Sequence, residues 1–233
     1  MRACRTVKLS FLATLAIGVV ACVAESPALN SERIARNYGS YGIVIIENKD
    51  NIRVSNLYSH EAAGPVCRTF AVVGLTDTVD AAFADEHALI TAGGSIGAVF
   101  RHSGWDISKR HRYIGEMPIG EKATRLVRLM RIKPPATLAV HIYVLAVSKG
   151  ERSFDYAMIA EVHHPDYLTT GKLRSIYGSG YSADTNRSNA KPVLVLLRGK
   201  FRDPLVQGPD GQMFGASVDW DYTRDTGKPD TWQ

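Results

Sequence analysis

The stretch from Gly93 to Gly97 reads Gly-Gly-Ser-Ile-Gly and places a serine between glycines in the pattern G-x-S-x-G. Serine hydrolases use this pattern at a sharp turn between a strand and a helix, where the glycines leave room for an exposed nucleophile. Ser95 is therefore a candidate nucleophile, and His163 or His164 is the candidate base that would take its proton.

The residues around Ser95 also allow a structural explanation, which we favour. A hydrolase of this type carries its acid between the serine and the histidine, but Asp106 is very close to Ser95 and Asp155 falls inside an expected strand. No clear glycine-rich loop upstream would supply an oxyanion hole. The favoured alternative is that the Ser95 hydroxyl caps a short helix beginning at Ile96, with close packing at the glycines.

A second candidate is the segment Glu-Val-His-His-Pro-Asp-Tyr, which contains residue types that bind metals. A zinc site needs three or four protein ligands. Adjacent residues of a strand point to opposite faces, so His163 and His164 diverge, and only Glu161 shares a face with His163.

The preceding strand offers a third ligand, His141. The two strands form a hairpin, and if Lys149 and Gly150 are its tip, His141 lies opposite Met158. That register puts His141 on the face away from the other candidates. We therefore predict no metal site and no cofactor.

The net charge is +5, and the stretch Ser-Lys-Arg-His-Arg-Tyr holds the densest group of cations, Lys109, Arg110 and Arg112. Such a stretch favours anionic partners, namely anionic lipid, lipopolysaccharide or an acidic glycan. The alternative is a solvated basic face without a specific partner. Nucleic acid is not an expected partner, because the N-terminus carries an export signal.

That signal begins with three cations, after which the thirteen residues 9–21 are apolar. A helix that spans a bilayer needs roughly 20 apolar residues, so this run has the length of a signal peptide. The end of the run, Val19-Val20-Ala21-Cys22, resembles the bacterial lipobox, which implies a lipid on Cys22. Cleavage after Ala24 is the alternative. The resemblance implies an outer-membrane lipoprotein facing the periplasm, and the alternative implies a free periplasmic protein.

We expect the signal in residues 1–21, a linker in 22–40, one globular domain in 41–220 and a loop-like tail in 221–233. Turn residues at 48–51 and 148–151 predict two hairpins, and Cys67 lies in a third, apolar strand. The segments 76–94 and 96–103 suit helices, residues 166–178 suit a turn and a short helix, and 191–199 suits a strand.

Strands arranged in hairpins with inserted short helices predict an α+β fold with a largely antiparallel sheet. The leading functional hypothesis is an exported, lipid-anchored envelope protein that binds or scaffolds a partner and is not an enzyme. The alternative is a periplasmic serine hydrolase that uses Ser95.

Overall fold

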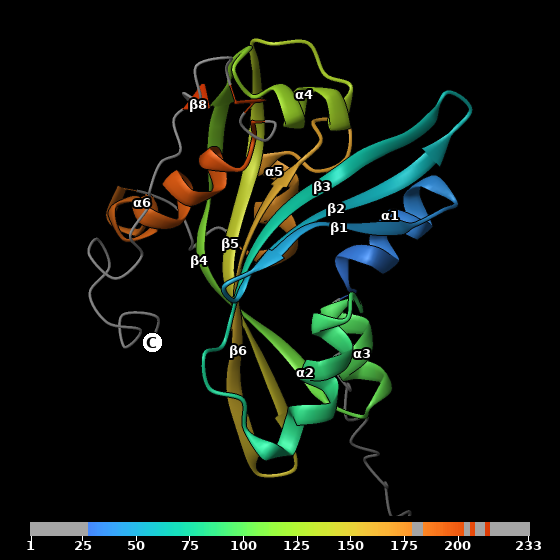
Figure 1. Cartoon of the computed structure of the whole chain (residues 1–233), viewed down its shortest axis with the longest axis vertical. Helices are drawn as coiled ribbons and strands as arrows, with labels where there is room; N and C mark the ends of the chain where they lie inside the picture. Colours follow the sequence, from blue (N-terminus) through green and yellow to red (C-terminus); the bar gives the residue numbers. More distant parts are fainter. Residues whose placement is uncertain (1–27, 179–183, 203–205, 208–212, 215–233) are drawn as a thin grey trace, which may run out of the picture.

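The computed structural model describes residues 28–178, 184–202, 206–207 and 213–214. The predicted signal, Cys22 and the predicted tail lie outside these residues. The chain forms the expected α+β fold, a six-stranded antiparallel sheet in the order β1-β2-β3-β6-β5-β4 (Figure 1).

The strands are β1 (Gly42–Lys49), β2 (Ile52–Glu61), β3 (Gly64–Leu75), β4 (Asp106–Ile119), β5 (Ala136–Lys149), β6 (Arg152–His163) and a separate pair, β7 (Val206–Gln207) and β8 (Met213–Phe214). The helices are α1 (Asn30–Tyr38), the 3₁₀ helix η1 (Ala81–Phe83), α2 (Ala84–Thr91), α3 (Ile96–His102), α4 (Thr124–Met130), α5 (Thr170–Tyr177) and α6 (Asp184–Gly199). None of these described helices is long and apolar enough to cross a membrane.

Both predicted hairpins are present. The β1–β2 turn uses Asp50 and Asn51, which adopt φ of 52° and 58°, the left-handed conformation that a two-residue hairpin turn requires. Cys67 is buried in β3, as its apolar surroundings predicted.

Helices cover both faces of the sheet, because successive strand residues bury apolar side chains on alternate sides. Helices α4 and α6 pack on one face, over residues such as Phe70 and Val140. Helices α1, α2, α3 and α5 pack on the other face (Figure 1). On that face Phe83 and Phe100 each stack edge to face with Tyr156. We call this second side the α1/α3 face.

One predicted strand differs from the structure. Residues 191–199, predicted as a strand, form the second half of α6. The buried residues Ala190 and Leu197 and the half-buried Val193 and Leu194 recur at three- and four-residue spacing, which is the period of a helix side packed on the core. Helix α1 lies within residues 22–40, and its Ile34 is fully buried on the sheet.

Candidate functional site

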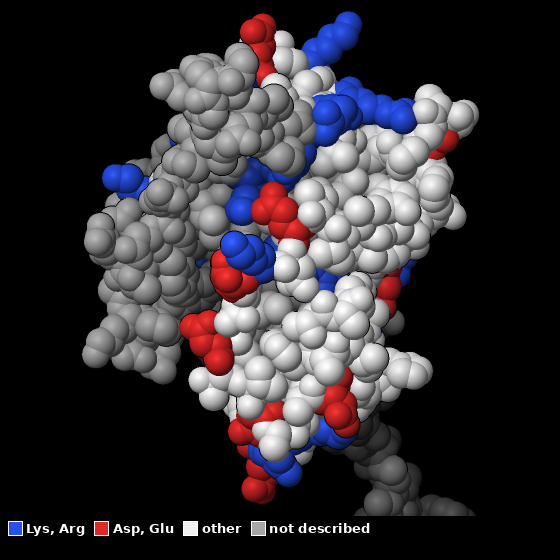
Figure 2. All heavy atoms as spheres, viewed as in Figure 1, with Lys and Arg blue, Asp and Glu red and all other residues white. Residues whose placement is uncertain are grey.

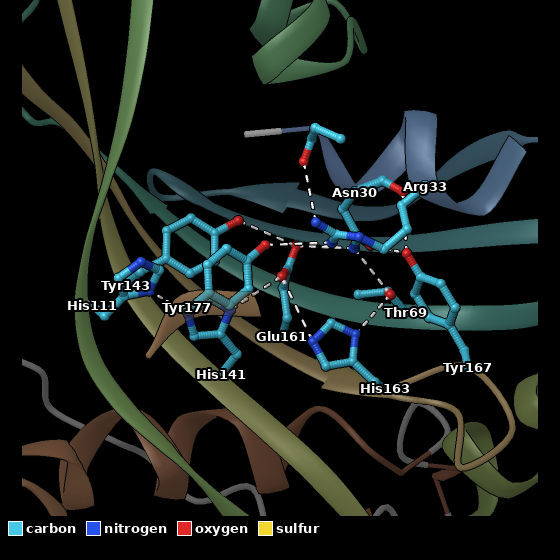
Figure 3. Close-up of polar contacts among 11 residues, drawn as sticks. Asn30, Arg33, Thr69, His111, His141, Tyr143, Glu161, His163, Tyr167 and Tyr177 are labelled. Atoms are coloured by element: carbon cyan, nitrogen blue, oxygen red, sulfur yellow. Dashed lines mark hydrogen bonds and ion pairs between the residues drawn. The ribbon is translucent and has the colours of Figure 1, made fainter. Parts of the chain in front are cut away.

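A cluster of buried polar side chains lies on the α1/α3 face, where β3, β6 and β5 run side by side (Figure 3). His141, Glu161 and His163 form its centre, and each is at most 5% exposed. The three ligand-type atoms of these side chains lie within 4.8 Å of one another. The sequence analysis placed His141 on the opposite face, and that placement is wrong.

The cause is a β-bulge in the β5–β6 hairpin. The tip is Gly150–Glu151, because Lys149 pairs with Arg152, and this shift of the turn alone leaves every residue on its predicted face. Further along, Leu145 pairs with Ala157 although Ala146 pairs with Asp155, so Tyr156 is an extra residue in β6. One inserted residue exchanges the faces of everything beyond it. His141 therefore pairs with Glu161 and shares its face.

The Glu161 carboxylate is held by one of its two oxygens. Its Oε1 accepts hydrogen bonds from Asn30 Nδ2 and from the Tyr143 hydroxyl, both at 3.2 Å. Its Oε2 faces the histidines, 3.8 Å from His163 Nε2 and 4.0 Å from His141 Nδ1. No Lys or Arg among the described residues forms an ion pair with this buried carboxylate.

Each histidine is anchored through its outer nitrogen. His163 Nδ1 lies 3.0 Å from Thr69 Oγ1, which also accepts a hydrogen bond from Asn30 Nδ2, and His141 Nε2 lies 2.7 Å from His111 Nδ1. The inner nitrogens, His141 Nδ1 and His163 Nε2, have no hydrogen-bond partner in the described part of the chain. Burial lowers the pKa of His163 to about 4 and that of His141 well below its usual range, so both rings are neutral at pH 7.

A pocket of about 80 Å³ lies beside this cluster. Its walls come from the start of α1, the start of α3 and strands β1 to β6, and they are mainly apolar. The polar side chains that line it are those of Asn30, Ser31, Tyr41, Arg53, Ser55, Ser95, Lys109, Tyr143 and Glu161. Glu161, Asn30 and Tyr143 thus belong to both the pocket and the buried cluster.

Arg53 is an unusual member of that lining, because its guanidinium is buried without a carboxylate partner. The side chain is 1% exposed and donates from Nη1 to the carbonyls of Ile90 and Gly94 and from Nε to Ser55 Oγ. No hydrogen bond from its Nη2 to a described residue is present. Burial lowers the pKa of Arg53, although an arginine stays protonated at neutral pH.

The three cations of the basic stretch lie in different environments. Lys109 lines the pocket, and its ammonium lies 4.4 Å from the centre of the Tyr143 ring. Arg110, the next residue in β4, points to the other side and forms an ion pair with Asp155, while Arg112 is half-buried. On the face drawn in Figure 2, Lys and Arg are interspersed with Asp and Glu rather than gathered into one patch.

Ser95 lies at the N-cap position of α3, as predicted, but its side chain makes no capping hydrogen bond. That part of the prediction is wrong. Ser95 lines the pocket, and no hydrogen bond joins it to a histidine within the described residues. The flanking glycines are explained by packing, since a Cβ on Gly94 would lie 2.8 Å from the Leu89 carbonyl oxygen and one on Gly97 would lie 2.7 Å from Leu29 Cδ2.

His164 is separate from both sites. Its Nε2 lies 3.1 Å from the Met130 carbonyl oxygen, and its Nδ1 accepts from the Asp166 backbone N–H, so the ring ties the end of β6 to neighbouring backbone. The sequence alone did not indicate a role for Asn30 or Thr69. For Arg53 the available signal was a cation placed between two apolar β-branched residues, Ile52 and Val54.

No protein-family model and no curated protein matches the sequence. Among solved structures, the chain is similar to a transcriptional regulator of the GntR family from Bacillus cereus. The two share 10% sequence identity, and the match covers 56% of this chain and 90% of that one with a TM-score of 0.34. A similarity this low carries no argument about function.

Proposed function

We propose that this chain is an exported, lipid-anchored envelope protein that binds a small organic carboxylate in the pocket on the α1/α3 face. The observation that carries the proposal is Arg53, a buried guanidinium that lines the pocket and has no carboxylate partner among the described residues. A buried charge is costly unless it is paired. A ligand carboxylate at Nη2 would supply the missing partner, because guanidinium and carboxylate form strong charge-assisted hydrogen bonds.

The remaining walls support a small and mostly apolar ligand. Leu57, Val73, Leu145 and Ile159 line the pocket, so the body of the ligand would lie against aliphatic side chains. One water needs about 10–15 Å³ of such space, so the volume of about 80 Å³ suits a compact acid rather than a polymer. Lys109 adds a second positive charge to the lining.

The envelope location rests on the sequence. Residues 1–22 begin with cations, continue as an apolar run and end with a small residue before Cys22. This order supports export and a lipid on Cys22, which would attach the domain to a membrane through the segment before α1. We still expect an anionic partner. We now propose that it binds in the pocket, which Lys109 lines, and not along the surface of the basic stretch.

The test compares benzoate with its neutral isostere benzamide on the purified protein by isothermal titration calorimetry. A hydrogen bond to a charged group contributes about 1.5–3 kcal/mol, so benzoate should bind at least about tenfold more tightly than benzamide. Arg53→Met should remove that preference, and Lys109→Met should reduce it. Equal affinities of wild-type protein for the two compounds, or no binding of either, would refute the proposal even if Arg53→Met does not fold.

A further inference from the structure

We infer that His141, Glu161 and His163 form a binding site for one divalent transition metal ion, with two imidazole nitrogens and one carboxylate oxygen as ligands. Two imidazoles and a carboxylate are a donor set that zinc, cobalt and iron(II) accept. This inference is independent of the proposed carboxylate ligand, since it rests on the buried cluster and not on Arg53.

Three electron-rich atoms of the buried cluster converge on one point. Glu161 Oε2 lies 3.8 Å from His163 Nε2 and 4.0 Å from His141 Nδ1, and both distances are too long for hydrogen bonds. A proton on either nitrogen therefore does not satisfy the carboxylate. A cation between the three atoms would satisfy all of them at once.

The gap between the three atoms is slightly wider than that of an occupied site. Bonds of about 2.0–2.1 Å place the ligand atoms of a tetrahedral zinc about 3.4 Å apart. Glu161 Oε2 lies 3.8 and 4.0 Å from the two histidine nitrogens, and all three atoms lie within 4.8 Å of one another, so binding would draw them inward. The backbone already pairs His141 directly with Glu161.

Each of the three ligand side chains is also held by a polar contact on the side away from the proposed ion. Metal-binding histidines commonly donate their other ring N–H to an acceptor, and metal-binding carboxylates are themselves hydrogen-bonded. Thr69 Oγ1 lies at the outer nitrogen of His163, His111 Nδ1 at that of His141, and Asn30 with Tyr143 at Glu161 Oε1 (Figure 3). These contacts leave the three inner atoms directed at one another.

The charge of the cluster also favours a cation. Glu161 is 5% exposed and has no Lys or Arg ion-pair partner in the described chain. A divalent ion would neutralise this buried carboxylate.

The experiment uses purified protein dialysed against EDTA and then against metal-free buffer. Co²⁺ is added while the visible absorption is recorded, and Zn²⁺ binding is measured by calorimetry. We expect one ion per chain. Loss of a hydrogen-bonded outer partner alone weakens metal binding 10- to 100-fold, so loss of a ligand in Glu161→Gln or His163→Gln should weaken it by at least about 100-fold.

The matched control is His60→Gln, since His60 is exposed on β2 and should not affect binding. A wild-type protein that takes up no Co²⁺ or Zn²⁺ overturns the inference, as do folded Glu161→Gln and His163→Gln proteins with wild-type affinity. If the variants do not fold, ¹⁵N NMR of wild-type histidine rings decides. Zn²⁺ should shift His141 Nδ1 and His163 Nε2 but not His60, and unchanged resonances overturn the site.

Discussion

Replacement of Thr69 tests separately whether the buried cluster stabilises the fold and whether it binds a metal ion. Its hydroxyl is fully buried in β3, accepts a hydrogen bond from Asn30 Nδ2 and lies 3.0 Å from His163 Nδ1. Thr69→Val keeps the volume of the side chain and removes the hydroxyl. Thr69→Ser is the matched control, because it keeps the hydroxyl and removes one methyl group.

The expected magnitudes follow from these contacts. A buried polar group that loses its partner costs about 1–3 kcal/mol, and Thr69→Val leaves two such groups, one N–H of Asn30 and the outer nitrogen of His163. The free energy of unfolding should therefore fall by about 2–6 kcal/mol. Thr69→Ser should cost only about 1 kcal/mol, the value of one buried methyl group with a small cavity.

Urea denaturation followed by circular dichroism measures the free energy of unfolding, and Co²⁺ titration measures the affinity for the metal ion. Thr69→Val should also bind Co²⁺ about 10- to 100-fold more weakly, whereas Thr69→Ser should remain near wild type. The reasoning is refuted if Thr69→Val is as stable as Thr69→Ser. Equal Co²⁺ affinities with unequal stabilities would restrict Thr69 to a structural role.

Three further predictions concern other parts of the chain. Burial raises the pKa of Glu47, but Lys200 and Arg125, 2.6 and 2.7 Å away, outweigh it and lower the pKa, so the carboxylate stabilises the fold above its unfolded pKa of about 4.5. This contribution is lost as the pH falls through the folded pKa, and Glu47→Gln should show a smaller loss of stability than wild type between pH 7 and acid pH in urea titrations. Ser95→Ala should change the free energy of unfolding by less than about 0.5 kcal/mol, because Ser95 makes no capping hydrogen bond. A fluorophosphonate probe should label neither the wild-type protein nor this variant. Labelling of the wild-type protein alone would support the hypothesis that Ser95 is a nucleophile. Cys22→Ser should release the protein from membranes into the soluble fraction, and unchanged membrane association would contradict lipidation.

Local sequence signals were sufficient for the hairpins and for several helices. The turn residues Asp50 and Asn51 and the alternating strands around them act over a few positions, so the sequence alone predicted β1 and β2 correctly. The sequence likewise predicts close packing at the glycines around Ser95, and the contacts at Gly94 and Gly97 confirm it. The antiparallel α+β class followed from these local features.

The candidate site, in contrast, was decided by tertiary structure. The extra residue Tyr156 in β6 brings His141 onto the face of Glu161 and His163, and no turn or periodicity signal in the sequence marks that bulge. The apolar run 191–199 became a helix because its spaced residues pack on the core, a choice that a short apolar run leaves open. Register and packing depend on partners distant in the chain, so the sequence determined which residues were available for chemistry, and only the fold decided which of them meet.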